Sequence, residues 1–252
     1  MDRTTHLRQR LDDIGRALAQ HDDALALIGL GSVGRELDRL DAYSDLDFFV
    51  IVRPGAKDRF LENTDWLEAA APVVFRHRGT GDGLHVLFAD GIYAESAVFT
   101  VAELGRAAYT PGRIIWKQPW VSDDLATPAA RPQPPHGWTL AKLLGEIQCN
   151  LYVGLLRFRR GERQAAVREV QLYAVDRLLH LAAFVEPEGA AAADPFAPAR
   201  RFEQRFPQMA AHLAAFQQGY DRTPESAAAI LDFLSARFPL NEGMTAAIRA
   251  LL

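Results

Sequence analysis

The 252-residue sequence predicts an α/β (α+β) domain with a small mixed sheet, followed by an all-α helical-bundle domain. In the first half, short apolar runs alternate with polar, glycine-containing turns, which is typical of strands joined by tight connections. In the second half, apolar residues recur at helical spacing over long segments. Residues 121–137 (VSDDLATPAARPQPPHG) separate the halves and contain four prolines, which is typical of a linker. We therefore place the two domains at 1–122 and 138–252.

The first domain is expected to begin with a helix and to continue with roughly four to six strands. The segment 5–20 is apolar at helical spacing, at Leu7, Leu11, Ile14 and Leu18. The run ALALIGL at 24–30 predicts a short buried strand, and LDFFVIV at 46–52, apolar on both faces, predicts a central strand. Residues 57–70 have a helical pattern. Three further strands are expected at 71–78, 83–90 and 91–99, the last two as a hairpin.

The second domain is expected to be helical throughout. Two long segments, 139–160 and 163–184, carry apolar residues at i, i+3 and i+4, with a turn at Arg160-Gly161-Glu162 between them. A break at 186–198 precedes three shorter helices. The third of these is expected to begin at Thr223-Pro224-Glu225, with threonine as the N-cap and proline at the first helical position.

Composition and charge exclude several classes of protein. Apolar residues make up 49% and charged residues 24% of the chain, as in an ordinary globular protein. With a net charge of -4 we expect no nucleic-acid partner, because sequence-independent binding needs clustered lysines and arginines. No apolar run approaches ~18 residues, so we expect no membrane span and a cytoplasmic location. The single cysteine, Cys149, permits no internal disulfide and is expected to be a buried thiol.

Residues 28–34 (IGLGSVG) match two glycine-rich patterns. Gly29, Gly31 and Gly34 satisfy the G-x-G-x-x-G of dinucleotide-binding turns. Gly31 and Ser32 also suit a loop whose backbone N–H groups and hydroxyl hold a triphosphate. A dinucleotide site needs a full crossover helix after the glycines and an acid at the far end of the second strand. Only RELDRLDAYSD separates Gly34 from the next strand, and its acids precede that strand, so the sequence favours the triphosphate loop.

Two carboxylates stand at the start of the strand expected at 46–52. Because residues two apart in an extended chain point to one face, Asp45 and Asp47 project together. The next two residues on that face, Phe49 and Ile51, are apolar. Two like charges this close favour a hard divalent cation with oxygen ligands, and Mg²⁺ is the natural candidate. The alternative is that this D-x-D merely opens a strand from a solvated loop.

A third carboxylate, Glu95, lies in the middle of the strand expected at 91–99, where glutamate is disfavoured. It shares a face with Tyr93, Ala97 and Phe99, so it points either into the core or across the sheet toward the aspartates. A buried, unpaired carboxylate is costly, which favours a metal-bound or catalytic role. The alternative is an edge strand on which Glu95 faces water.

A glycine-serine turn, a D-x-D that opens a strand and a third carboxylate on a neighbouring strand together resemble the polymerase-beta-type nucleotidyltransferase superfamily. The residues that carry this resemblance are GLGSVGRELDRLDAYSDLDFFVIV (29–52) and DGIYAESAVF (90–99). The similarity covers most of the chain, weakly after about residue 185. More narrowly, four segments resemble the antibiotic nucleotidyltransferases that adenylate lincosamides. These segments are Asp65-Trp66-Leu67, Ala71-Pro72, VLFADGIYAE (86–95) and NLYVGLLRFRRGE (150–162).

The resemblance implies a Mg²⁺-dependent nucleotidyltransferase (adenylyltransferase) that moves AMP from ATP to a hydroxyl of a small, antibiotic-like molecule, and hence antibiotic resistance. It also implies two Mg²⁺ ions and a homodimer through the long helices. Residue by residue, it assigns the nucleotide to Gly31, Ser32 and Arg35, the metal ions to Asp45, Asp47 and Glu95, and the general base to Glu95. Twelve residues separate Ser32 from Asp45, a longer loop than the family usually has, and this loop carries Arg35.

A function of another class is a nucleotide-dependent regulator or a protein-adenylating, antitoxin-like module. Such modules are usually small, so the large helical half favours an enzyme with its own acceptor site. The most basic stretch, 157–168 (RFRRGERQAAVR), holds five arginines that either contact phosphate or end a solvated helix. His85 and His180 sit in apolar runs and are expected to be core histidines.

Overall fold

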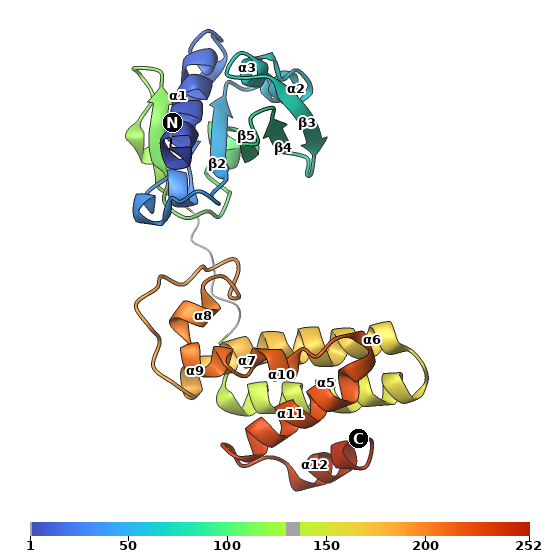
Figure 1. The fold of residues 1–252 in the computed structure, drawn as a ribbon. Coiled ribbons are helices and arrows are strands. Elements are labelled where there is room, and N and C mark those ends of the chain that lie inside the picture. Colours follow the sequence, from blue (N-terminus) through green and yellow to red (C-terminus); the bar gives the residue numbers. More distant parts are fainter. Residues whose placement is uncertain (1, 130–136) are drawn as a thin grey trace. The chain divides into compact units, whose positions relative to one another are not determined.

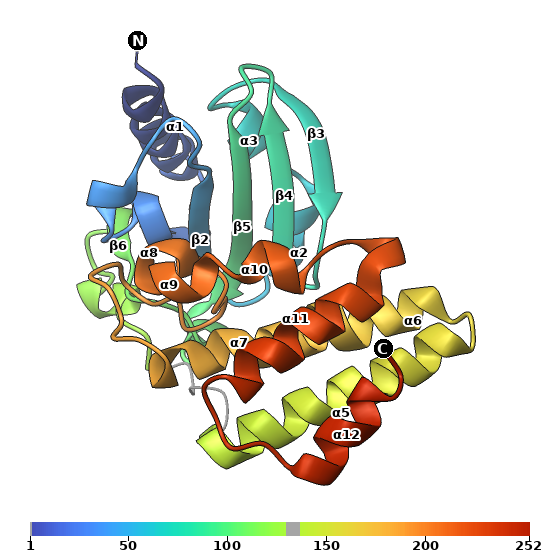
Figure 2. The same cartoon turned by 60° about the horizontal axis from the view of Figure 1, so that its bottom comes forward.

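The computed structural model describes residues 2–129 and 137–252 of the chain. The chain forms two compact units, Met1–Pro132 and Gln133–Leu252. Figures 1 and 2 show that the first unit contains the sheet and that the second is helical. Of the linker expected at 121–137, residues 130–136 lie outside the described residues. None of the helices in the described ranges combines the length and the apolar character needed to cross a membrane.

The described residues of the first unit form a six-stranded mixed sheet with the strand order β3-β4-β5-β2-β1-β6. The central pair, β2 and β5, is parallel, and every other neighbouring pair is antiparallel. The mixed sheet predicted from the sequence is therefore confirmed, while β6 is a strand that the sequence did not indicate. The bounds are β1 (Ala24–Gly29), β2 (Leu46–Val52), β3 (Val73–Arg78), β4 (Gly83–Phe88), β5 (Tyr93–Thr100) and β6 (Arg113–Lys117).

One face of the sheet is covered by α1 (Arg3–Leu18), α2 (Lys57–Glu62) and α3 (Asp65–Glu68). The apolar stripe of α1 packs against the side chains of Leu46, Phe48 and Val50, which alternate along β2. The single helix expected at 57–70 is divided into α2 and α3, because Asn63 turns to an extended conformation at the end of α2. The Asn63 side chain then bonds the backbone N–H and the carboxylate of Asp65, at the start of α3.

The opposite face of the sheet is apolar at one end only. Phe49 and Ile51 of β2 pack there with Phe99 of β5, under α4 (Val101–Leu104) and a 3₁₀ turn, η3 (Asp123–Ala126). The rings of Phe49 and Phe99 meet edge to face at 5.1 Å, and the Tyr109 ring lies 5.4 Å from Phe49. The starts of β2 and β5 lie beyond this cluster. The face therefore changes from apolar to polar along the strands, as the order Asp47, Phe49, Ile51 predicts.

The second unit begins with two long helical segments, as expected. The first is α5 (Leu140–Arg159), which Thr139 caps by accepting a hydrogen bond from the backbone N–H of Lys142. Gly161, with a φ of 81°, makes the turn into the second segment. That segment is one continuous helical stretch that includes a π-helical part. Its pieces are α6 (Arg163–Val167), η4 (Arg168–Ala174), α7 (Val175–Leu181) and η5 (Ala182–Phe184).

Three expectations for the second unit are wrong. Within 186–252 there are five α-helices where three were expected: α8 (Phe202–Arg205), α9 (Pro207–Ala210), α10 (Leu213–Phe216), α11 (Thr223–Ser235) and α12 (Glu242–Arg249). Thr223 is the first residue of α11 and not its cap, because its buried hydroxyl accepts a hydrogen bond from the Gln171 side chain instead. Cys149 is exposed, since it lies off the buried stripe of α5.

The packing of α5 makes opposite predictions for its two glycines. A Cβ on Gly154 would lie 2.5 Å from Val170 Cγ2, whereas one on Gly145 would meet no atom within 4 Å. We expect Gly145→Ala to stabilise the protein by about 0.5–1 kcal/mol, because alanine favours the helix. We expect Gly154→Ala to destabilise it by about 1–3 kcal/mol through overpacking. Thermal unfolding followed by circular dichroism measures both, and shifts of equal sign would contradict this packing.

Candidate active site

The parallel pairing of β2 with β5 brings two of the predicted carboxylates together. Asp47 is the register partner of Glu95. Neighbouring strands lie about 4.8 Å apart and register partners point to the same face, so the two side chains stand side by side. Both project from the polar end of the face that carries Phe49 and Phe99. Figure 2 shows β2, β5, β4 and β3 side by side. Asp47 belongs to β2 and Glu95 to the neighbouring β5.

Asp45 lies one residue before β2 and is half-buried. Its position relative to the pair is reported by Tyr93, the first residue of β5. Burial raises the pKa of the Tyr93 hydroxyl, and the negative charges of Glu95, Asp45 and Asp47 raise this pKa further. A carboxylate opposes formation of the phenolate only from nearby. All three predicted carboxylates therefore act on the pKa of this one hydroxyl.

The glycine-rich turn lies against Asp47. It forms a 3₁₀ turn, η1 (Gly31–Val33), directly after β1, and Gly31 has a φ of 50°. The backbone N–H of Leu30 donates to the carbonyl of Asp47 at 2.8 Å, which joins the turn to the start of β2. A Cβ added to Gly31 would lie 3.8 Å from Asp47 Oδ2. The turn that carries Ser32 thus borders the carboxylate pair.

The outer glycines of the motif serve packing. A Cβ on Gly29 would lie 2.7 Å from the carbonyl oxygen of Val33, and one on Gly34 would lie 2.7 Å from that of Gly29. Because neither glycine has a side chain, the backbone of the turn can fold back closely onto β1. The strand that follows, β2, is antiparallel to β1. A dinucleotide-binding unit needs two parallel strands joined by a crossover helix, so the structure excludes this interpretation.

Glu95 lies beside Asp47, as one of its two expected orientations had it, and neither in the core nor on an edge strand. It is on an interior strand, not on an edge, and its side chain is 48% exposed, so it is not buried. Its carboxylate is held by a neighbour on its own strand, because the Tyr93 hydroxyl donates to Glu95 Oε1 at 3.2 Å. A glutamate is tolerated inside this strand because its side chain faces the open, polar half of the sheet face.

Two histidines extend the row of Asp47 and Glu95 across the sheet. His85 of β4 is the register partner of Glu95, and His77 of β3 is the partner of His85. The expectation that His85 is a core histidine is wrong. Leu84 and Val86 on either side of it point into the core, so His85 points to the opposite face and is 33% exposed. His180 is only half-buried, against Trp138, so the core position expected for it is wrong as well; its partial burial lowers its pKa.

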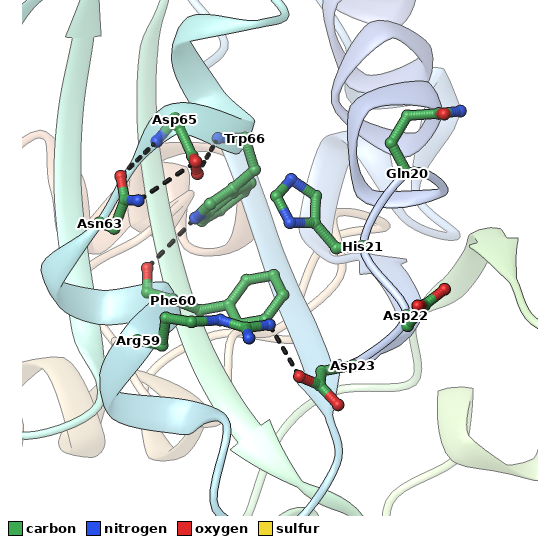
Figure 3. A pocket seen from close by; sticks show the side chains of 9 residues that line it. All are labelled: Gln20, His21, Asp22, Asp23, Arg59, Phe60, Asn63, Asp65 and Trp66. Carbon is green, nitrogen blue, oxygen red and sulfur yellow. Dashed lines mark hydrogen bonds and ion pairs between the residues drawn. The ribbon is translucent and has the colours of Figure 1, made fainter.

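A groove of about 230 Å³ runs over this part of the sheet, and Asp47, Glu95, His85 and Thr80 are among its lining residues. A larger pocket, of about 380 Å³, lies between the segment that joins α1 to β1 and helices α2 and α3. Figure 3 shows that several of its polar groups make contacts within the fold: Arg59 pairs with Asp23, and the Trp66 indole N–H donates to the carbonyl of Phe60. The groove, which contains the carboxylates, is the candidate site.

Arg35 and Arg39 differ in what they contact. Arg35 Nε donates to the carbonyl of Gly112 at 2.9 Å, which ties the loop after η1 to the start of β6. Arg39 belongs to the 3₁₀ turn η2 (Leu37–Arg39). Its Nη2 pairs with Glu36 and would lie 3.9 Å from a Cβ on Gly31, and its buried Nε has no hydrogen-bond partner within the described chain. Arg39 was missed from the sequence, because a loop residue without periodicity gives no signal of its direction.

The described residues contain no group of three His, Cys, Asp or Glu side chains placed to hold one metal ion. The predicted set of Asp45, Asp47 and Glu95 is therefore not a single closed cage; Glu95 instead bonds to Tyr93. The donor chemistry at the start of β2 nevertheless fits Mg²⁺, which usually takes one or two carboxylates together with phosphate oxygens and water. Asp45 and Asp47 are the residues that would hold such an ion.

The arginines at 157, 159 and 163 have partners inside the helical unit. Arg157 pairs with Glu162, Arg163 pairs with Asp221, and Arg159 donates to the carbonyl of Leu251. These contacts hold the end of α5 and the turn after it. They favour the structural interpretation of this basic stretch over phosphate binding.

The convergence of carboxylates on Tyr93 predicts a specific titration. Glu95→Gln removes one of the charges that oppose the phenolate, so the pKa of Tyr93 falls. A pH titration of ring-¹³C-labelled tyrosine, followed by NMR, measures this. The matched control is Asp12→Asn, which neutralises an exposed carboxylate of α1 and leaves the Tyr93 titration unchanged. An unchanged titration in Glu95→Gln would mean that the carboxylate is not beside the hydroxyl.

Comparison with known proteins gives little at the level of sequence. No protein-family model and no curated protein matches the chain. Among solved structures, the chain is similar to an aminoglycoside 6-adenyltransferase from Bacillus subtilis. The sequence identity is 14%, the match covers 97% of this chain and 90% of that chain, and the TM-score is 0.32. At this level of similarity, a function for the chain has to come from its own residues.

Proposed function

We propose that the protein is a nucleotidyltransferase that transfers AMP from ATP to a hydroxyl of a small, antibiotic-like molecule. The observation that carries this proposal is the register pairing of Asp47 with Glu95, next to the Gly31 turn. Asp45, one residue before β2, adds a third carboxylate. Carboxylates of this kind have two uses in phosphoryl chemistry, to hold Mg²⁺ and to accept a proton.

The proposed roles follow from position. Asp45 and Asp47, at the start of β2, hold Mg²⁺ together with the triphosphate. Two such ions, held there, would supply positive charge against the charge that develops on the attacking and leaving oxygens. Gly31 and Ser32 bind phosphate oxygens at the turn. Arg39 is added to this group because its guanidinium lies beside Gly31, whereas Arg35 holds the loop in place through Gly112.

Glu95 is the proposed general base. The hydroxyl of the acceptor loses its proton to Glu95 and attacks the α-phosphorus, and the bond from that phosphorus to the leaving pyrophosphate breaks. A side chain that is half-exposed above an open groove can be reached by a small molecule. An acceptor of this size also agrees with the net charge of -4, which gives no electrostatic basis for nucleic-acid binding.

The antibiotic-like character of the acceptor rests on the resemblance of the sequence to the lincosamide nucleotidyltransferases. The homodimer through the long helices rests on the same resemblance and stays a prediction. A protein acceptor, as in an antitoxin-like module, is the alternative outcome of the experiment that follows.

Incubation with ATP, Mg²⁺ and a panel of lincosamides, aminoglycosides and sugars tests the function. We expect one acceptor to gain the mass of an adenylyl group, with release of pyrophosphate. Glu95→Gln is expected to lower kcat by about 10²- to 10⁴-fold, the usual effect of a general base. Asp47→Asn is expected to abolish transfer because a ligand of the ion is lost.

The matched control is Asp12→Asn. Asp12 lies on α1, which covers the opposite face of the sheet from the groove, so this variant is expected to keep the wild-type rate. Transfer that survives Glu95→Gln would remove Glu95 from the role of base. Mass gain on a protein and on none of the small molecules would favour the antitoxin-like alternative.

A further inference from the structure

The carboxylate of Glu95 is held by a short chain of hydrogen bonds. The Tyr93 hydroxyl donates to Glu95 Oε1 at 3.2 Å. On its other side, the same hydroxyl lies 2.8 Å from His85 Nδ1. His85 Nδ1 is itself 3.5 Å from Glu95 Oε1. Three groups on two neighbouring strands therefore meet at one carboxylate oxygen.

The direction of the chain follows from the chemistry of its members. An ionised carboxylate only accepts hydrogen bonds, so the Tyr93 hydroxyl has to donate its single proton to Glu95. The Tyr93 oxygen then accepts from His85, which requires a proton on Nδ1. The contacts thus select the Nδ1–H tautomer of His85.

Packing leaves His85 little freedom. Its ring stacks on His77 with 5.9 Å between the centroids and on Tyr93 with 6.2 Å. A Cβ on Gly79, in the loop between β3 and β4, would lie 2.3 Å from His85 Nε2. The absence of a side chain at residue 79 is therefore what admits the imidazole. The loop at Gly79 and the ring of His77 pack against His85, and the Tyr93 hydroxyl connects His85 to Glu95.

We propose that Tyr93 and His85 are positioning residues, which hold Oε1 of Glu95 and leave Oε2 for the proton of the acceptor hydroxyl. This inference rests on the proposed role of Glu95 as general base. A half-exposed glutamate has three rotatable bonds and many orientations, and one hydrogen-bonded oxygen removes most of them. A misplacement of about 1 Å can cost 10²-fold in rate, so such a support affects turnover more than binding.

Tyr93→Phe keeps the ring and removes only the hydroxyl. We expect kcat to fall about 10- to 100-fold while KM for ATP and for the acceptor stays within about twofold. Gly79→Ala is expected to produce the same kinetic pattern, because it displaces His85 without altering Tyr93 or Glu95. The matched control is Gly81→Ala in the same loop, where a Cβ meets nothing within 4 Å and the wild-type rate is expected.

His85→Asn and His85→Leu separate positioning from packing. The asparagine amide places an N–H donor near the position of Nδ1, so His85→Asn is expected to keep most of the rate, whereas His85→Leu is expected to behave like Tyr93→Phe. Equal losses in the two variants, or a change confined to KM, would overturn the proposal. The pair also serves if Gly79→Ala fails to fold.

Long-range ¹H–¹⁵N spectra of labelled histidine report the tautomer of His85 without any need for activity. We expect Nδ1–H in the wild type and in Gly81→Ala, and its loss in Gly79→Ala and Tyr93→Phe. If no acceptor is adenylylated, the proposed function fails, yet these spectra still decide whether the support exists. An Nε2–H tautomer in the wild type would overturn the inference even in an active enzyme.

Discussion

The parallel pairing of β2 with β5 is the constraint on which the candidate site depends. The pair lies at the centre of the sheet, and its register sets Asp47 opposite Glu95. A shift of one residue would turn Glu95 into the core and bring Ala94 or Ser96 to the groove, because side chains alternate between faces. The register is in turn held by apolar residues further along the strands, among them the edge-to-face pair of Phe49 and Phe99.

That arrangement divides one face of the sheet into two environments. At one end, Phe49, Ile51 and Phe99 are covered by α4 and η3, so the strands are anchored there by burial. At the other end, carboxylates face an open groove, where water limits the cost of keeping like charges close together. The buried ends of the strands thus anchor the neighbouring positions that carry the carboxylates. Catalytic groups have to keep their geometry during a reaction, and strands anchored in this way support them.

Much of this was predictable from local patterns. The alternation Asp47, Phe49, Ile51 indicated one polar and one apolar stretch on a shared face, and LDFFVIV indicated a central strand. Glutamate within a strand marked Glu95 as unusual. The alternation on β4 was misjudged at His85, since a histidine in an apolar run does not reveal which face is covered. Cys149 was misjudged for a similar reason, because a thiol is apolar enough to suit a core yet lies off the stripe of α5.

By itself, the sequence determined the classes of the two halves, most strand positions and the residue types available for chemistry, because these depend on short-range periodicity and on side-chain composition. Only the tertiary structure decided which strand stands beside which. The contact of Tyr93 and His85 with Glu95 depends on the pairing of β4 with β5, and the approach of Arg39 to Gly31 depends on the path of an irregular loop. Register, loop path and face coverage arise from contacts between residues far apart in the chain, which no local pattern encodes.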